Sequence, residues 1–229
     1  MKYKSLIITL LLLPYCALAQ MAQNQTLIHN LTALIKEKDN YTQQKERKIK
    51  ETIDLLRVPN ASAEQRYAIN QRLFDEFKTY ISDSAVYYVK ENIRIAEELQ
   101  KPDLQNDSRL SLASLYIISG NYLDAADLLR AIDKEQLQEP QLIQYYNCYL
   151  NLYNNYAFNN PDAKTYIAKS DAYRDLLLNL VDKNSTHYIL LYAGVLPDAG
   201  RYDEAEKLLL DRFALMHPDE HEKAVLGYV

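Results

Sequence analysis

The chain has 229 residues, with 26 basic and 31 acidic side chains and a net charge of −5 at neutral pH. This acidic balance, without a long basic stretch, argues against nucleic acid as a direct partner, because phosphate binding needs clustered Lys and Arg. Four Gly and seven Pro are too few for the many tight turns of a β-sandwich or barrel, and no Gly-rich phosphate loop is present. The 20 Tyr recur mostly at helical spacing, so the sequence predicts an all-α protein.

The first residues have the features of a secretory signal. Lys2 and Lys4 precede the apolar run 6–13, and residues 17–19 before Gln20 have the A-x-A form of a cleavage site. The apolar run is too short for a membrane anchor, which needs about 20 residues. We therefore expect the segment before Gln20 to be removed as a signal peptide and the protein to be exported.

Removal of residues 1–19 changes the composition of the mature chain. Two basic and no acidic residues are lost, so the net charge changes from −5 to −7. Cys148 is then the single cysteine, and one thiol cannot form an internal disulfide. Stability must therefore come from buried apolar area.

The next segment, residues 20–59, predicts one long helix, because residues 24–57 contain no Gly or Pro. Its apolar residues recur at helical steps, but Lys38 and Lys45 interrupt this seam. Charges alternate in sign over residues 36–51, which is typical of a solvated helix with i,i+4 ion pairs. The alternative is a short coiled coil that would join two chains in a homodimer.

Residues 60–229 predict a right-handed solenoid of antiparallel helix pairs. Gly120, Asn160 and Gly200 stand 40 residues apart, and each suits a left-handed bend between two helices. A fixed interval of this size is typical of helical repeats. The first predicted helix lies near 62–79 and has a capping box at its start. The others lie near 82–100, 103–119, 122–133, 139–157, 161–181, 185–197 and 202–216.

The residues around these turns resemble the tetratricopeptide repeat, in which small residues let two helices approach closely and aromatic rings fill the gaps. Ala stands five residues after both Gly120 and Gly200, whereas Thr165 holds that position after Asn160. The interval of 40 exceeds the usual length of about 34 residues, which implies longer helices or loops.

Two stretches also resemble the start of a bacterial family of exported tetratricopeptide-like proteins of unknown function. They are Leu31 to Leu56, with Lys38-Asp39, Tyr41, Lys45-Glu46 and Ile49, and Tyr80-Ile81-Ser82-Asp83-Ser84-Ala85, followed by Asn92 and Ile95-Ala96. Longer members add a transmembrane helix and a cytoplasmic segment thought to regulate transcription. The resemblance implies that the chain is the periplasmic sensing half of such a regulator. Because the helical pattern is still under way at Val229, we expect the natural protein to continue, and a membrane contact would come through that extension.

The helix predicted at 139–157 holds the candidate binding residues. One stripe, expected in the core, consists of Tyr145, Tyr149, Leu152 and Tyr156. A second stripe consists of Asn147, Asn151 and Asn154. In tetratricopeptide folds the first helix of each pair lines a groove, and an Asn amide there can grip a peptide backbone through both donor and acceptor. We interpret the Asn stripe as binding a protein or peptide; a solvated polar face is the alternative.

Metal and catalytic sites are not expected, and neither is a cofactor. His217 and His221 stand four residues apart, but Pro218 and the acids after it are typical of a helix start, and zinc would need further ligands. Cys148 lies in a helical pattern without a marked His and acid, so we expect a core thiol. Asp83-Ser84-Ala85 resembles an acceptor motif for periplasmic O-glycosylation, although a helix start explains it equally well.

A binding module is therefore the leading hypothesis for function. A cell-envelope or glycan-processing enzyme is the alternative from another class, since its paired carboxylates cannot be excluded among 31 acids. A structural scaffold, dimerised through the first helix, is a third.

Overall fold

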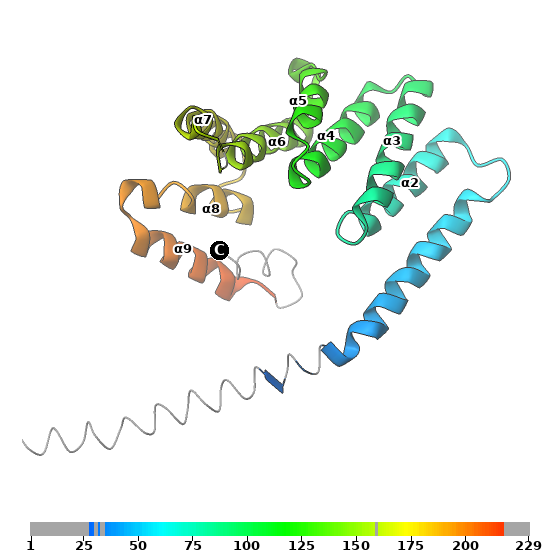
Figure 1. Cartoon of the computed structure of the whole chain (residues 1–229), viewed down its shortest axis with the longest axis horizontal. Coiled ribbons are helices and arrows are strands. Elements are labelled where there is room, and N and C mark those ends of the chain that lie inside the picture. The colour runs from blue at the N-terminus through cyan, green and yellow to red at the C-terminus, as the bar shows by residue number, and fades with distance from the viewer. Residues whose placement is uncertain (1–27, 30–31, 33–34, 159, 218–229) are drawn as a thin grey trace, which may run out of the picture. The chain divides into compact units, whose positions relative to one another are not determined.

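The computed structural model describes residues 28–29, 32, 35–158 and 160–217 (Figure 1). The predicted signal peptide and the second residue of the histidine pair, His221, lie outside this part of the chain. The chain divides into two compact units, Met1–Pro59 and Asn60–Val229. In the first unit, residues 35–56 form one continuous helix, which falls within the predicted long helix.

The second unit consists, in its described part, of helices that pack on their neighbours in chain order. Helices α2 and α3, α4 and α5, α6 and α7, and α8 and α9 make the pairs, and α4 also packs on α6. This confirms the predicted all-α architecture of packed helix pairs. The elements are α2 (Ala63–Phe77), α3 (Ser82–Glu98), α4 (Pro102–Ile118), α5 (Tyr122–Arg130), the 3₁₀ turn η1 (Lys134–Gln136), α6 (Glu139–Phe158), α7 (Ala163–Leu180), α8 (Thr186–Ala193), the 3₁₀ turn η2 (Pro197–Ala199) and α9 (Tyr202–Leu215).

Helix α2 begins with the predicted capping box. The Gln65 N–H donates to Ser62 Oγ at 3.2 Å, and the Ser62 N–H donates to Gln65 Oε1 at 2.8 Å. Two N–H groups at the start of the helix are thereby satisfied.

Three helix ends close with the same left-handed turn. Gln100, Gly120 and Gly200 have φ values of 55°, 81° and 71°. After Gly120, the Asn121 N–H donates to the Tyr116 carbonyl at 2.8 Å, and the equivalent bonds after Gln100 and Gly200 measure 3.0 and 2.9 Å. This is the Schellman motif, which satisfies carbonyls that the helix end leaves open.

Asn160 does not adopt the left-handed backbone that its spacing predicted. In the described part of the chain, the residues other than Gly with positive φ are Asn60 and Gln100. The side chain of Asn160 instead accepts a hydrogen bond from the Asp162 N–H at 2.9 Å. An Asn side chain that mimics a backbone turn therefore replaces the left-handed residue at this bend.

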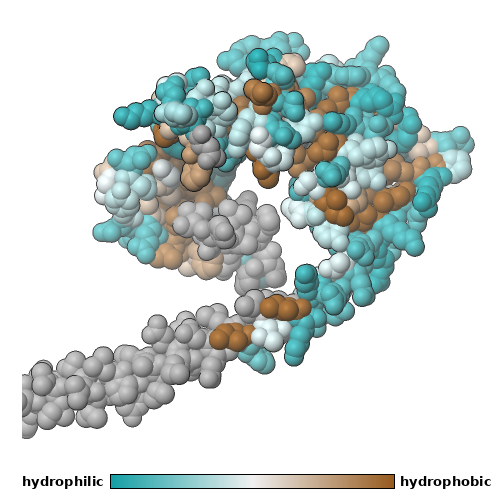
Figure 2. All heavy atoms as spheres, in the orientation of Figure 1, coloured by the Kyte–Doolittle hydropathy of each residue, from teal (hydrophilic) through white to brown (hydrophobic). Residues whose placement is uncertain are grey.

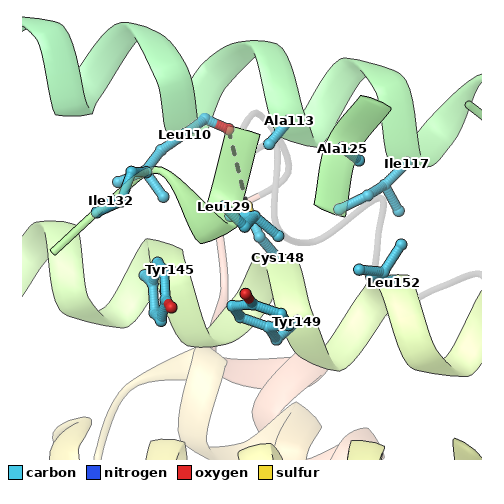
Figure 3. Close-up of a cluster of buried hydrophobic side chains, with 10 residues drawn as sticks. All are labelled: Leu110, Ala113, Ile117, Ala125, Leu129, Ile132, Tyr145, Cys148, Tyr149 and Leu152. Carbon is cyan, nitrogen blue, oxygen red and sulfur yellow. Dashed lines mark hydrogen bonds between the residues drawn. The ribbon is translucent and has the colours of Figure 1, made fainter. Parts of the chain in front are cut away.

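The main hydrophobic core lies between α4, α5 and α6 (Figure 3). Ala113 of α4 and Ala125 of α5 are small enough to let the helices approach closely, and Tyr145 and Tyr149 of α6 lie below them. Its buried members are Leu110, Ala113, Ile117, Ala125, Leu129, Ile132, Tyr145, Cys148, Tyr149 and Leu152.

The surface of the second unit is mixed in character. In Figure 2 the visible helix surfaces are mostly hydrophilic, and hydrophobic side chains show between the helices. Among the described residues, no helix combines the length and the apolar character needed to cross a membrane.

Candidate binding groove

A groove of about 230 Å³ lies between α4 and α6, the first helices of two consecutive pairs. It combines apolar, hydroxyl, thiol and amide groups, without a charged side chain. Its lining residues are Ser114, Ile117, Ile118, Cys148, Asn151 and Asn155.

Helical periodicity explains why these side chains share one space. On α4, Ser114, Ile117 and Ile118 stand at steps of three and four residues, which puts them on one face. On α6, Asn151 and Asn155 stand one turn apart. Ile117 is buried, but the side chain of Ile118 is 82% exposed. The groove therefore offers an open apolar edge beside two amides.

The floor of the groove is closed by Ser114 and Cys148. Ser114 Oγ lies 3.2 Å from Cys148 Sγ and donates to the Leu110 carbonyl at 3.0 Å. Burial raises the pKa of the Cys148 thiol to about 11. The thiol therefore stays protonated near neutral pH, and a protonated thiol is not a nucleophile. Its position confirms the expected core thiol.

The three predicted Asn residues face three different neighbours. Asn151 lines the groove. Asn147 Oδ1 lies 3.0 Å from Nε2 of His187 on α8, and Asn154 Oδ1 accepts from Ser170 Oγ on α7 at 2.5 Å. The structure thus places one of the three in the groove, and their role in binding stays a prediction that now centres on Asn151.

Asn155 is the groove residue that the sequence interpretation missed. It stands four residues after Asn151 and is exposed, whereas Asn154 is engaged by α7. A step of three and a step of four both keep residues on one helical face, so the spacing fits either Asn. The neighbouring helix, which the periodicity does not reveal, decides between them.

The predicted tyrosine core is correct at one end and wrong at the other. Tyr145 and Tyr149 are 8% exposed, and the Tyr149 ring stacks on Tyr173 with centroids 4.8 Å apart. Burial raises the pKa of the Tyr149 hydroxyl well above its ordinary value. Tyr156, however, is 36% exposed, and its ring meets Tyr166 edge-on at 4.7 Å. Tyr156 also meets the ring of Tyr122 on α5 edge-on at 5.8 Å, so the C-terminal end of the stripe lies at the surface against both α5 and α7.

The structure also bears on possible metal ligands and on the Asp83-Ser84-Ala85 motif. No group of three or more His, Cys, Asp or Glu side chains suited to a metal ion occurs among the described residues. In the Asp83-Ser84-Ala85 motif, Ser84 is half-buried and Ala85 is fully buried in α3.

The helical-repeat fold agrees with the comparison to protein families. Residues 35–229 match the family model described as the SusR N-terminal TPR domain. The chain belongs to this family. The match confirms the tetratricopeptide-like resemblance, and such domains are helical protein-interaction modules that are typically not catalytic. Comparisons with curated proteins and with solved structures give no match.

Proposed function

We propose that the groove between α4 and α6 binds an extended segment of a partner protein or peptide, and that the chain is the periplasmic sensing half of a membrane-associated regulator. The observation that carries the first part is the pair of exposed amides, Asn151 and Asn155, beside the exposed side chain of Ile118.

The spacing of the two amides supports a peptide backbone as the ligand. Four residues of α-helix rise about 6 Å, at about 1.5 Å per residue. An extended peptide repeats its side-chain direction every two residues, or about 6.7 Å. Asn151 and Asn155 can therefore meet two equivalent peptide groups, since each amide both donates and accepts. Ile118 would then contact an apolar side chain of the bound segment.

The groove can be tested by crosslinking the protein in its native envelope. We expect the double variant Asn151→Ala/Asn155→Ala to lose the specific crosslinked partners while its helical circular dichroism stays unchanged. Asn179→Ala, at an exposed site on α7, is the matched control and should keep them. Unchanged partners in the double variant would rule out this groove. Loss of partners in a folded Asn147→Ala/Asn154→Ala variant would instead favour the other two amides.

The cellular location is part of the same proposal. The basic residues, the apolar run and the A-x-A site at the N-terminus support export. The family description calls this an N-terminal domain, which supports the proposal that the chain is one part of a longer protein. We expect the exported protein to begin at Gln20, which mass measurement of the periplasmic fraction checks; an intact Met1 in the membrane fraction would contradict it. An apolar run of about 20 residues in the reading frame after Val229 would support the membrane sensor.

A further inference from the structure

A second pocket, of about 660 Å³, lies between α3, α4 and α5. Its volume is in the range of small-molecule sites, roughly 300 to 1,000 Å³. The pocket is lined by Lys90 and Ile93 of α3, by Arg109, Leu112 and Tyr116 of α4, and by Asp124, Asp127, Leu128 and Ala131 at α5.

This pocket lies on the other side of α4 from the groove. At about 100° per residue, Arg109, Leu112 and Tyr116 share one face of the helix, whereas Ser114 and Ile118 share the opposite one. The two sites therefore share a wall without sharing a lining residue, and their lining chemistry differs, because the groove has no charged side chain.

The charges in this pocket are divided by sign between its walls. The cations Lys90 and Arg109 stand on α3 and α4, and the carboxylates of Asp124 and Asp127 stand on α5. Among the described residues, no ion pair joins a cation of one wall to a carboxylate of the other: Arg109 lies 4.0 Å from Glu97, and Asp127 pairs with Arg130.

Of these four charged side chains, Lys90 and Asp124 form no ion pair with another described residue. The Lys90 ammonium lies 5.8 Å from the centroid of the Tyr116 ring, and no carboxylate lies within ion-pair distance of it in the described chain. Asp124 forms no ion pair or side-chain hydrogen bond there either. Both side chains are exposed, and the apolar side chains of Ile93, Leu112 and Leu128 lie in the same pocket.

We propose that this pocket binds a short zwitterionic peptide with apolar side chains. The peptide carboxylate faces Lys90, its ammonium faces Asp124, and its side chains cover the apolar lining. A simple anion fits less well because the two carboxylates repel it, and a lone cation fits less well because the two basic side chains do. A ligand that carries both charges and an apolar body can pair with the basic and the acidic side chains and also cover the apolar ones.

Three related probes test the proposal by NMR titration of the full exported chain: the dipeptide dileucine, its N-acetylated form and its C-terminal amide. Dileucine should shift the signals of the pocket residues, and each blocked form should bind about two- to fivefold more weakly, the size expected of an exposed ion pair. Lys90→Met should abolish the difference between dileucine and its amide. Asp124→Asn should abolish the difference between dileucine and its acetylated form.

Matched controls separate this pocket from general charge effects and from the groove. Lys164→Met and Asp175→Asn change exposed charges on α7 and should leave all three affinities unchanged. Asn151→Ala/Asn155→Ala should also bind dileucine normally, since the two sites have no lining residue in common. The proposal is overturned if dileucine shifts none of the pocket signals up to its solubility limit, or if all three peptides bind equally to the unmodified chain.

Discussion

Cys148 shows how burial determines the chemistry of one side chain. The residue is 2% exposed, its Sγ lies 3.7 Å from the Leu110 carbonyl, and burial raises its pKa to about 11. Each of these features disfavours the thiolate, which is the reactive form.

The thiol should therefore label slowly in the folded protein. On a chain that starts at Gln20, Cys148 is the single thiol. At pH 8 we expect a disulfide reagent to react at least roughly 100-fold more slowly with the native chain than with the denatured one, since each unit of pKa lowers the thiolate fraction about tenfold. The rate is followed by absorbance with and without denaturant. Equal rates in both states would contradict the buried position.

Tyr149 and Tyr156 should differ in their contribution to stability. Tyr149→Ala removes a buried ring stacked on Tyr173 and should lower the free energy of unfolding by about 3 to 5 kcal/mol. Tyr156→Ala removes a partly exposed ring and should cost about 1 kcal/mol, the size of an aromatic edge contact. Urea denaturation measures both, with Tyr149→Phe as the control that keeps the ring. A larger loss for Tyr156 would reverse this assignment.

For single residues, the sequence predicted which side chains are buried better than it predicted which side chains they contact. The helical period places Tyr145 and Tyr149 on one face, and both are buried. The same period could not show that α7 engages Asn154 or that Asn155 is left for the groove. Those outcomes depend on the position of a second helix. The residue spacing within one helix carries no information about that position.

The turns are the clearest feature at the scale of the elements. Gly120 and Gly200 both hold left-handed backbone, and a Cβ built at either residue would meet no atom within 4 Å. Substitution there is therefore opposed by backbone conformation alone. Gln100 holds the same conformation with a full side chain, which is strained for an L-residue.

Opposite substitutions at these turns should have opposite effects. Gly120→Ala and Gly200→Ala should each lower the free energy of unfolding by about 1 to 2 kcal/mol, the cost of a left-handed non-Gly residue. Gln100→Gly should raise the free energy of unfolding by up to about 1 kcal/mol. The backbone strain that Gly relieves is larger than the entropic cost of ordering a more flexible residue on folding. Thermal unfolding of the three variants checks the signs. Stabilisation by Gly120→Ala would be incompatible with the turn described above.

Helix positions were predictable because turn residues, caps and apolar spacing agree along the chain. Helix α8 is the main exception: the apolar pattern predicted helix to residue 197, but the helix ends at Ala193, residues 194–196 form a turn, and a 3₁₀ turn begins at Pro197. Gly194 and Pro197 favour that break. Asn160 is the other exception, since an Asn can make a turn with either its backbone or its side chain.

At the scale of the whole molecule, buried tyrosine and cysteine should make stability depend on alkaline pH. Burial raises the pKa of Tyr173 from its ordinary 10.0 to about 12 and that of Cys148 from 9.0 to about 11. Between about pH 9 and 12 the folded chain therefore keeps protons that the unfolded chain releases. Stability should be fully present below pH 9 and should fall as pH rises through this window.

Urea denaturation at pH 8, 10 and 11.5 measures this fall. Tyr173→Phe has no hydroxyl to titrate and should show a shallower loss above pH 10 than the unmodified chain. Tyr87→Phe, at an exposed tyrosine in α3, is the matched control and should follow the unmodified chain. A flat profile up to pH 11.5 would contradict the buried, protonated groups.

The pairing of helices with their chain neighbours also determines how the molecule opens. In α9 the buried residue is Ala205, Leu215 is 80% exposed, and Arg212 joins the helix to Thr186 of α8 at 3.0 and 2.8 Å. The α4 to α6 region instead holds the cluster of buried side chains in Figure 3. Helix pairs that contact only neighbouring pairs can open one at a time. In hydrogen-exchange measurements, the amide hydrogens of α9 should therefore exchange through local openings. Those of α4 and α6 should exchange only when the whole unit unfolds.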